Sequence, residues 1–253
     1  MSTVVFIGGR NIARSLRTPM LSAVSLVQPV VWLTLFSQTF RGLGDVAQFR
    51  AEGYHDYLSF FTPGMVVLSM LFTALQSGMA TMSDIDSGMM DKFLASPVRR
   101  LTILGGRVWA DMLTMLAQGA VILVIATAMG VRDKTGPAGA IMLLAFATAF
   151  GIIWAALSNL IALLTRNAEL TMALGFLLTL PVLFMSSAFF PLRLQPAWLQ
   201  RVSDANPAAY VITSGQQLLN SGNNTAQDMR TIIALAVAAA ILVPATVLAF
   251  RKV

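Results

Sequence analysis

Six long uncharged stretches divide this chain of 253 residues, and each is 20 residues or longer. A helix of that length crosses a hydrocarbon layer ~30 Å thick. The stretches are 18–40, 57–83, 112–131, 135–165, 170–192 and 231–250. The pattern predicts an all-α polytopic membrane protein with six transmembrane helices, over about 18–40, 57–83, 108–131, 137–165, 170–190 and 231–250.

A seventh uncharged stretch, 205–227, differs from the others in composition. It is rich in Asn, Gln, Ser, Thr and Pro, and lipid does not solvate such polar side chains. We therefore expect a loop on the membrane surface there. Residues 1–253 are then a single transmembrane domain, with 1–17 lying before the first span.

The composition agrees with a membrane protein and removes several kinds of site. Hydrophobic residues make up 57% of the chain and charged residues 11%, against roughly 25% charged in a soluble domain. Cysteine is absent and His55 is the single histidine, which excludes thiolate and multi-histidine metal sites. We expect no catalytic, metal or cofactor site, and interpret His55 as part of a solvated loop.

The basic residues predict the orientation. With the N-terminus inside, the inner segments hold ten Lys or Arg and the longer outer segments hold seven. This is the bias that cytoplasmic loops show, so both termini are expected in the cytoplasm. The basic residues are scattered along the membrane borders without forming a stripe, so we do not expect nucleic-acid binding.

The chain lacks the sequence features by which a transporter would use an ion gradient or bind ATP itself. No ionisable residue lies near a span centre, where proton- or sodium-driven carriers usually have one. Asp111 follows Arg107 by four residues, a spacing that predicts an ion pair on one helix. Prolines at 29, 63, 181 and 244 fit kinks or helix starts, although broken helices can also bind ions through carbonyls. None of the three lysines lies in a Gly-Lys-[Ser/Thr] nucleotide loop.

Two segments flanking the predicted spans on the cytoplasmic side are amphipathic. In 2–17, Arg10, Arg14 and Arg17 share one helical face, which fits an interfacial helix or a simple basic flank. In 84–97, acidic residues at the start favour a helix N-terminus, and Met and Phe follow before Pro97. This second helix could dock into a soluble partner through its Met and Phe side chains. Alternatively, it fits an amphipathic helix that lies on the lipid headgroups. Asp84, Asp86 and Asp91 fit a solvated helix face or, alternatively, a divalent-ion site.

The outer segment 191–220 carries interfacial residues. Pro196 can begin a short helix that turns Trp198 and Leu199 toward the bilayer, and Asn206-Pro207 separates it from a second short helical segment. Tryptophan and tyrosine suit this depth. The segment fits an extracellular lid that dips into the outer leaflet, or a plain interfacial anchor.

These motifs, in this order, resemble the permease subunits of type-2 ATP-binding-cassette exporters, most closely the daunorubicin-resistance and nodulation-factor exporter branch. The matching segments are Arg10-Asn-Ile with Arg17-Thr-Pro, Tyr57-Leu-Ser-Phe-Phe-Thr-Pro-Gly-Met, Asp86-Ser-Gly-Met-Met-Asp-Lys-Phe-Leu-Ala-Ser-Pro-Val-Arg-Arg, Gly106-Arg107 with Asp111, and Ser186-Ser-Ala-Phe-Phe-Pro with Pro196-Ala-Trp-Leu-Gln and Asn206-Pro. The chain departs from the family at Gln195, where Leu-Pro-x-Trp is more usual.

The resemblance implies six spans per subunit, pairing with a second identical or different permease, and two copies of a cytoplasmic ATPase that binds ATP and Mg. It implies an ATPase-coupling helix formed by Asp84, Asp86, Gly88, Met89, Met90, Asp91, Lys92, Phe93, Leu94 and Pro97, beside the interfacial helix of Arg10, Arg14 and Arg17. It implies an extracellular cap of re-entrant helices that contains Pro191, Pro196, Trp198, Leu199, Asn206 and Pro207.

The expected function is therefore that of a permease subunit in the bacterial plasma membrane, powered by a separate ATPase. Fifteen Met, fifteen Phe and few amides in the spans favour an amphipathic drug or a lipid-like cargo over a polysaccharide. Two other classes stay open. A gradient-driven carrier or channel would transport without a partner, and a membrane-embedded enzyme or assembly factor would need a reactive cluster at one membrane face.

Overall fold

The computed structural model describes residues 19–51, 53–54, 56–88, 100–131 and 134–250. His55, the predicted interfacial residues Arg10, Arg14 and Arg17, and most of the predicted coupling helix lie outside these ranges. Every regular element within them is a helix. The elements are α2 (Pro19–Thr39), η1 (Arg41–Asp45), α3 (Ala47–Ala51), α4 (Tyr57–Asp86), α6 (Arg100–Ala128), α7 (Pro137–Thr165), α8 (Ala168–Phe184), η2 (Leu192–Leu194), α9 (Ala197–Asp204), α10 (Pro207–Asn220) and α11 (Thr225–Phe250).

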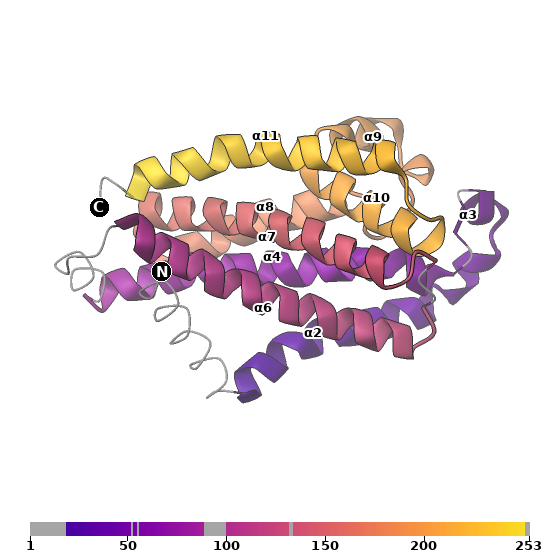
Figure 1. Ribbon diagram of the computed structural model, residues 1–253, viewed down its shortest axis with the longest axis horizontal. Helices are drawn as coiled ribbons and strands as arrows, with labels where there is room; N and C mark the ends of the chain where they lie inside the picture. The colour runs from indigo at the N-terminus through magenta and orange to yellow at the C-terminus, as the bar shows by residue number, and fades with distance from the viewer. Residues whose placement is uncertain (1–18, 52, 55, 89–99, 132–133, 251–253) are drawn as a thin grey trace.

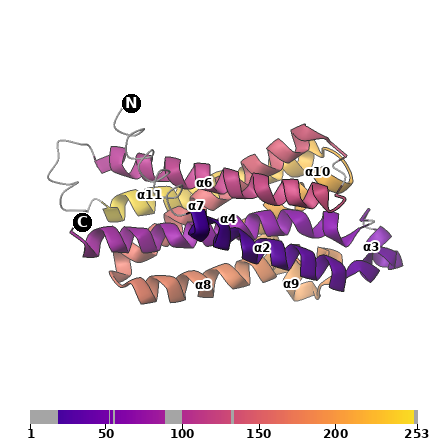
Figure 2. The same ribbon diagram turned by 90° about the horizontal axis from the view of Figure 1, so that it is seen from below.

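The long helices form an elongated bundle (Figure 1). The end that carries η1, α3, α9 and α10 is called the capped end here. The opposite end carries the end of α4, the beginning of α6, the short α7–α8 connection and the last turn of α11. Figure 2 shows the same division from below, with α8 along one side of α4.

Four helices in the described part are long and apolar enough to cross a membrane by length and composition. They are Tyr57–Asp86, Gly105–Ala128, Pro137–Thr165 and Thr225–Phe250, and Ala168–Phe184 is a shorter apolar helix. The described part of the chain is thus all-helical, and the protein is of the multi-span membrane type. Several helices extend past the predicted span limits: α6 begins at Arg100, α4 continues to Asp86, and α11 begins at Thr225.

Helix α4 is the centre of the bundle. It packs against α2, α6, α7, α8 and α10, and Tyr57, Phe60, Phe61 and most residues up to Ala74 are buried. A helix that is apolar on every face is buried on every face, which accounts for its central place. Asp56 caps its first turn, where its carboxylate accepts hydrogen bonds from the Ser59 amide and hydroxyl, both at 3.1 Å.

The outer helices expose apolar side chains. In α8 the buried positions Thr171, Gly175, Thr179 and Leu183 recur every four residues and form one stripe toward the bundle. Leu177, Phe184 and other large side chains on its remaining faces are exposed. Lipid or another membrane protein can cover such a surface, whereas its exposure to water would be unfavourable in free energy. The four prolines noted above lie inside α2, α4, α8 and α11.

Candidate functional site

The predicted coupling segment follows α4 and precedes α6. Asp84 and Asp86 lie in the last turn of α4, so the prediction that they begin a new helix is wrong. Gly88 follows the cap residue Ser87 with a φ of +65°, a left-handed conformation that glycine adopts without strain. The amide of Gly88 donates to the Ile85 carbonyl at 3.0 Å. The residues Met89, Met90, Asp91, Lys92, Phe93, Leu94 and Pro97 lie outside the described ranges.

Arg107 joins the beginning of α6 to the end of α4. Its Nη1 atom lies 3.1 Å from Asp84 Oδ2, and its Nη2 atom donates to the Ser77 carbonyl at 2.8 Å. The two side chains are only 16% and 31% exposed, so water screens their attraction less than it screens a surface pair. The carboxylate of Asp84 is therefore already paired with Arg107. This weakens the alternative that Asp84, Asp86 and Asp91 bind a divalent ion.

The predicted pair between Arg107 and Asp111 is present only as an attraction between the two charges, because Arg107 makes its close ionic contact with Asp84. Asp111 Oδ2 instead accepts a hydrogen bond from Ser77 Oγ at 2.6 Å. The reason is tertiary: α4 lies beside α6 and offers partners nearer to each side chain than the next helical turn does. Local spacing carries no information about that neighbour.

A buried polar network continues from Ser77 into α7. Asn159 Nδ2 donates to Ser77 Oγ at 3.0 Å and to the Ala155 carbonyl at 2.7 Å, and Thr81 donates to Asn159 Oδ1. A satisfied buried network fixes the arrangement of the elements it joins. The sequence analysis counted few amides in the spans and did not single out Ser77 or Thr81. Their spacing of one helical turn within an apolar helix was the available signal.

Close backbone packing accompanies this network. A methyl group added at Gly78 would lie 2.3 Å from Ser158 Oγ and 2.6 Å from the Ser158 carbonyl oxygen. Ser158 Oγ donates to the Leu75 carbonyl at 3.2 Å. Helices α4, α6 and α7 are thus held together near the end of α4 that enters the predicted coupling segment.

At the capped end, the residues predicted for the extracellular cap form two helices. Helix α9 begins at Ala197, directly after Pro196, and Trp198 on it is 61% exposed. Leu199 is half-buried and Pro191 is buried. Gln195, where the chain departs from the family pattern, donates through Nε2 to the carbonyls of Ser186 (2.9 Å) and Phe190 (3.0 Å).

Asn206 connects this cap to the end of α8. Its Oδ1 accepts from the Ala208 amide at 3.0 Å, which caps α10, and Pro207 takes the first helical position. Its Nδ2 donates to the carbonyls of Val182 at 2.6 Å and Met185 at 3.1 Å. One side chain thus ends α8 and begins α10.

The prediction of a surface loop over 205–227 is wrong for most of its length. Helix α10 is largely buried and packs against α4, α7 and α11. Gln216 Nε2 donates to the Phe60 carbonyl at 3.2 Å, and Asn220 Nδ2 donates to the Gln216 carbonyl at 2.8 Å. Burying a side-chain amide costs little free energy once the amide is hydrogen-bonded. Its partners here are backbone carbonyls, which the amino-acid composition does not predict.

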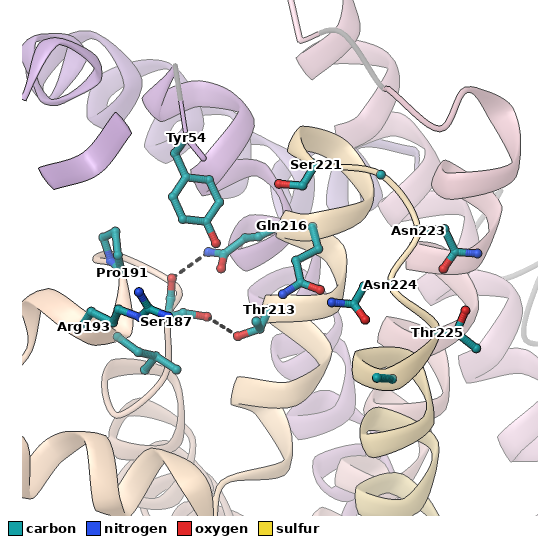
Figure 3. A pocket seen from close by; sticks show the side chains of 14 residues that line it. Tyr54, Ser187, Pro191, Arg193, Thr213, Gln216, Ser221, Asn223, Asn224 and Thr225 are labelled. Carbon is teal, nitrogen blue, oxygen red and sulfur yellow. Dashed lines mark hydrogen bonds between the residues drawn. The ribbon is translucent and has the colours of Figure 1, made fainter. Parts of the chain in front are cut away.

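Two hollows flank this cap. One is a groove of about 860 Å³ between α9, α10 and α11. The exposed side chains of Ile233, Val237 and Ile241 form its apolar part, while Asp204 and Arg230 line its polar part. The other is a polar cavity of about 780 Å³ between 187–193, α10 and the α10–α11 connection, with Tyr54 at its edge (Figure 3).

Comparison with known proteins places this architecture in a family. Residues 3–219 match the family model described as ABC-2 type transporter. The chain is 24% identical to the daunorubicin resistance ABC transporter permease protein DrrB1 of Streptomyces coeruleorubidus, over 77% of this chain and 67% of the relative. It is 30% identical to the putative transport permease ycf38 of Cyanophora paradoxa, over 78% and 67% of the two chains. It is 21% identical to the probable doxorubicin resistance ABC transporter permease protein DrrC of Mycobacterium tuberculosis, over 75% and 67%.

The chain therefore belongs to the ABC-2 type transporter family, which confirms the resemblance seen in the motifs. It is a membrane permease subunit of an exporter, and the family implies an ATPase partner and a partner permease. The individual coupling and cap residues stay predictions, because these matches concern the chain as a whole.

Proposed function

We propose that the chain exports an amphipathic, drug-like or lipid-like molecule from the cytoplasm or the inner leaflet. The observation that carries the proposal is the groove beside α11. Its apolar part, with Ile233, Val237 and Ile241, suits an apolar body, and Asp204 and Arg230 suit a polar end. Ligand sites commonly combine such an apolar lining with a few polar groups. The relatives named for daunorubicin and doxorubicin resistance support a drug-like cargo.

The energy for export comes from ATP, with its Mg ion, bound by a separate cytoplasmic ATPase. In this proposal the segment 84–97 docks into the ATPase, and the polar network transmits its movement. Asp84 lies at the start of the segment, and through Arg107 and Ser77 it is connected to α6 and α7. A displacement of the docked segment would then move three helices as one body, which is a common way of switching between states.

The complete exporter in this proposal contains two permease subunits, identical or different, and two ATPase copies. It lies in the bacterial plasma membrane with both termini in the cytoplasm. Support comes from the placement of the end of α11, the end of α4 and the beginning of α6 at the same end of the bundle (Figure 1). The exposed apolar faces of α8 leave room for lipid and for the second permease.

Phe93 variants test the coupling directly. The chain is coexpressed with a candidate partner ATPase of the ATP-binding-cassette class, and copurification and efflux of a fluorescent amphipathic drug are measured. Phe93→Glu should insert normally yet lose ATPase association and efflux, because a charge does not bury in an apolar groove. Phe93→Leu, which stays apolar, should retain both. Survival of association and efflux in Phe93→Glu would show that the docking assignment is wrong.

A further inference from the structure

An acidic side chain lines the groove beside α11. Asp204 is the last residue of α9, and it is exposed on the groove. Its backbone carbonyl accepts a hydrogen bond from the Tyr210 hydroxyl at 2.6 Å. Its carboxylate has neither a hydrogen bond nor an ion pair in the part of the chain that the structure describes. The carboxylate is therefore available to a ligand, and its replacement breaks no contact that holds the fold.

Asp204 lies farther from the capped end than Arg230, the basic residue of the same groove. Helices α10 and α11 follow each other through a short connection and pack side by side, so they are antiparallel. Thr231 Oγ1 donates to the Tyr210 carbonyl at 3.1 Å, which puts these two residues at one level. Helical side chains point toward the beginning of their own helix. Tyr210 therefore extends away from the capped end, and there it reaches Asp204.

The two charges of the groove are not equivalent. Arg230 is exposed, and no ion pair joins it to Asp204 among the described residues. Its long side chain points toward the beginning of α11, at the capped end, where it can place its charge in water. The side chain of Asp204 has a single methylene group and cannot leave the groove in this way. The inner part of the groove therefore keeps a net negative charge.

The end of α9 adds to this negative charge. The carbonyl end of a helix carries a partial negative charge, and Asp204 lies directly on it. Arg201 belongs to the same last turn and is exposed, but it is not among the groove-lining residues that the structure describes. A positively charged group is therefore attracted to this place, and an anion is repelled from it.

The rest of the groove favours a cation that carries an apolar body. The side chains of Ile233, Val237 and Ile241 are exposed along it. The small residues Ala234 and Ala238 lie between them and leave room. An inorganic ion gains nothing from such a wall, whereas an amphiphile buries apolar surface against it.

We propose that Asp204 is the residue by which this groove selects cationic amphiphiles over neutral and anionic ones. Its carboxylate binds the positive group, and α11 covers the apolar body. The assignment rests on the proposed function where it makes the bound cation the cargo; the binding itself can be measured without transport.

Two lipophilic ions of the same shape and opposite charge, tetraphenylphosphonium and tetraphenylborate, test the proposal. The full chain with its ATPase partner is placed in phosphatidylcholine nanodiscs without nucleotide. Equilibrium binding of radiolabelled tetraphenylphosphonium is measured, and binding to empty nanodiscs is subtracted. Asp204→Asn should weaken binding about tenfold through the loss of one charge–charge attraction, while Asp204→Glu should retain most of it. Unchanged affinity in Asp204→Asn, or displacement by tetraphenylborate as strong as by the unlabelled cation, would overturn the proposal.

Matched variants test the location of the site. Val237→Trp fills the groove and should abolish binding, whereas Ile232→Trp is on the same helix, exposed, outside the groove lining, and should leave it unchanged. Glu169→Gln removes an exposed acid at the opposite end of the bundle and should bind tetraphenylphosphonium as the unchanged chain does. Equal effects of the two tryptophans, or a loss in Glu169→Gln equal to that in Asp204→Asn, would overturn the assignment.

Two further measurements separate the remaining outcomes. Tetramethylammonium carries the charge without the apolar body and should not displace tetraphenylphosphonium; equal displacement would mean a site for small cations and would overturn the proposal. ATP-driven efflux of a fluorescent amphipathic drug is measured in parallel. Absence of efflux with binding that depends on Asp204 would contradict the proposed function alone, and efflux with binding that does not depend on Asp204 would contradict this assignment alone.

Discussion

Arg107 of α6 binds Asp84 of α4 across the helix interface, with Nη1 and Oδ2 3.1 Å apart. One turn along α6, Asp111 binds Ser77 of the same neighbour. Helix α6 is therefore fastened to α4 at two successive levels, next to the segment predicted to contact the ATPase.

Removal of the Arg107 charge should destabilise the protein and uncouple it. Arg107→Gln leaves Asp84 partly buried without its cation, and the expected loss is about 1.5–3 kcal/mol, the range for hydrogen bonds to charged groups. Thermal unfolding in detergent measures the loss, and drug-stimulated ATP hydrolysis measures the coupling. Arg41→Gln, on an exposed residue of η1 at the capped end, serves as the control and should change little.

A double-mutant cycle attributes that effect to the pair. Asp84→Asn combined with Arg107→Gln should cost less than the sum of the two single changes, because the second change removes the uncompensated charge. Strict additivity would mean that the ion pair does not carry the effect.

Asp111→Asn should preserve ATP-driven efflux. An asparagine oxygen can still accept the hydrogen bond from Ser77 Oγ, whereas it cannot carry a proton. Asp111→Leu removes the acceptor, leaves Ser77 with one partner fewer, and should lower both stability and efflux. Efflux rates in cells at equal expression distinguish the two variants. Loss of efflux in Asp111→Asn with normal stability would favour a gradient-driven mechanism.

Gly78→Ala should disturb the contact between α4 and α7. The added methyl group would meet the Ser158 side chain and backbone at less than 3.0 Å, and overpacking of this kind costs roughly 1–3 kcal/mol. Gly105→Ala on α6 is the matched control, since no atom lies within 4 Å of its added methyl group; it should be neutral or slightly stabilising. A similar unfolding temperature for both variants would contradict the close approach.

Asn206 variants separate its two roles. Asn206→Ser keeps an oxygen that can cap α10 but loses both donations to the end of α8, and Asn206→Ala loses all three hydrogen bonds. We expect Asn206→Ala to cost about 0.5–2 kcal/mol more than the serine variant, the value of an N-cap. Both variants should increase proteolysis between α8 and α10. Equal unfolding temperatures for the two variants would mean that the cap contributes nothing.

The hydrophobic pattern predicted helices well because charged side chains avoid a hydrocarbon environment, so their positions delimit apolar helices. Helix α7, Pro137–Thr165, occupies the range predicted for the fourth span. The prediction for 205–227 was wrong because polarity was taken as evidence against burial. The amides of Gln216 and Asn206 are buried because backbone carbonyls of other segments meet them, and those carbonyls belong to the fold.

The polar contacts near the predicted coupling segment were the least predictable part. The i to i+4 rule considered partners on one helix, whereas Asp84 precedes Arg107 by 23 positions and becomes its neighbour only when α4 and α6 pack side by side. Serine and threonine, such as Ser77 and Thr81, are common in apolar helices, where their hydroxyl groups usually hydrogen-bond to backbone carbonyls of the same helix. Their role as links to Asp111 and Asn159 depends on the rotation of three helices.

Transport by reconstituted vesicles distinguishes an ATP-driven permease from a gradient-driven carrier. The chain is incorporated with its ATPase or alone, and accumulation of a fluorescent amphipathic drug is followed with ATP or with an imposed proton or sodium gradient. We expect accumulation only when both proteins and ATP are present, and none with the chain alone under any gradient. Accumulation by the chain alone under a gradient would show that the ATPase does not power the export.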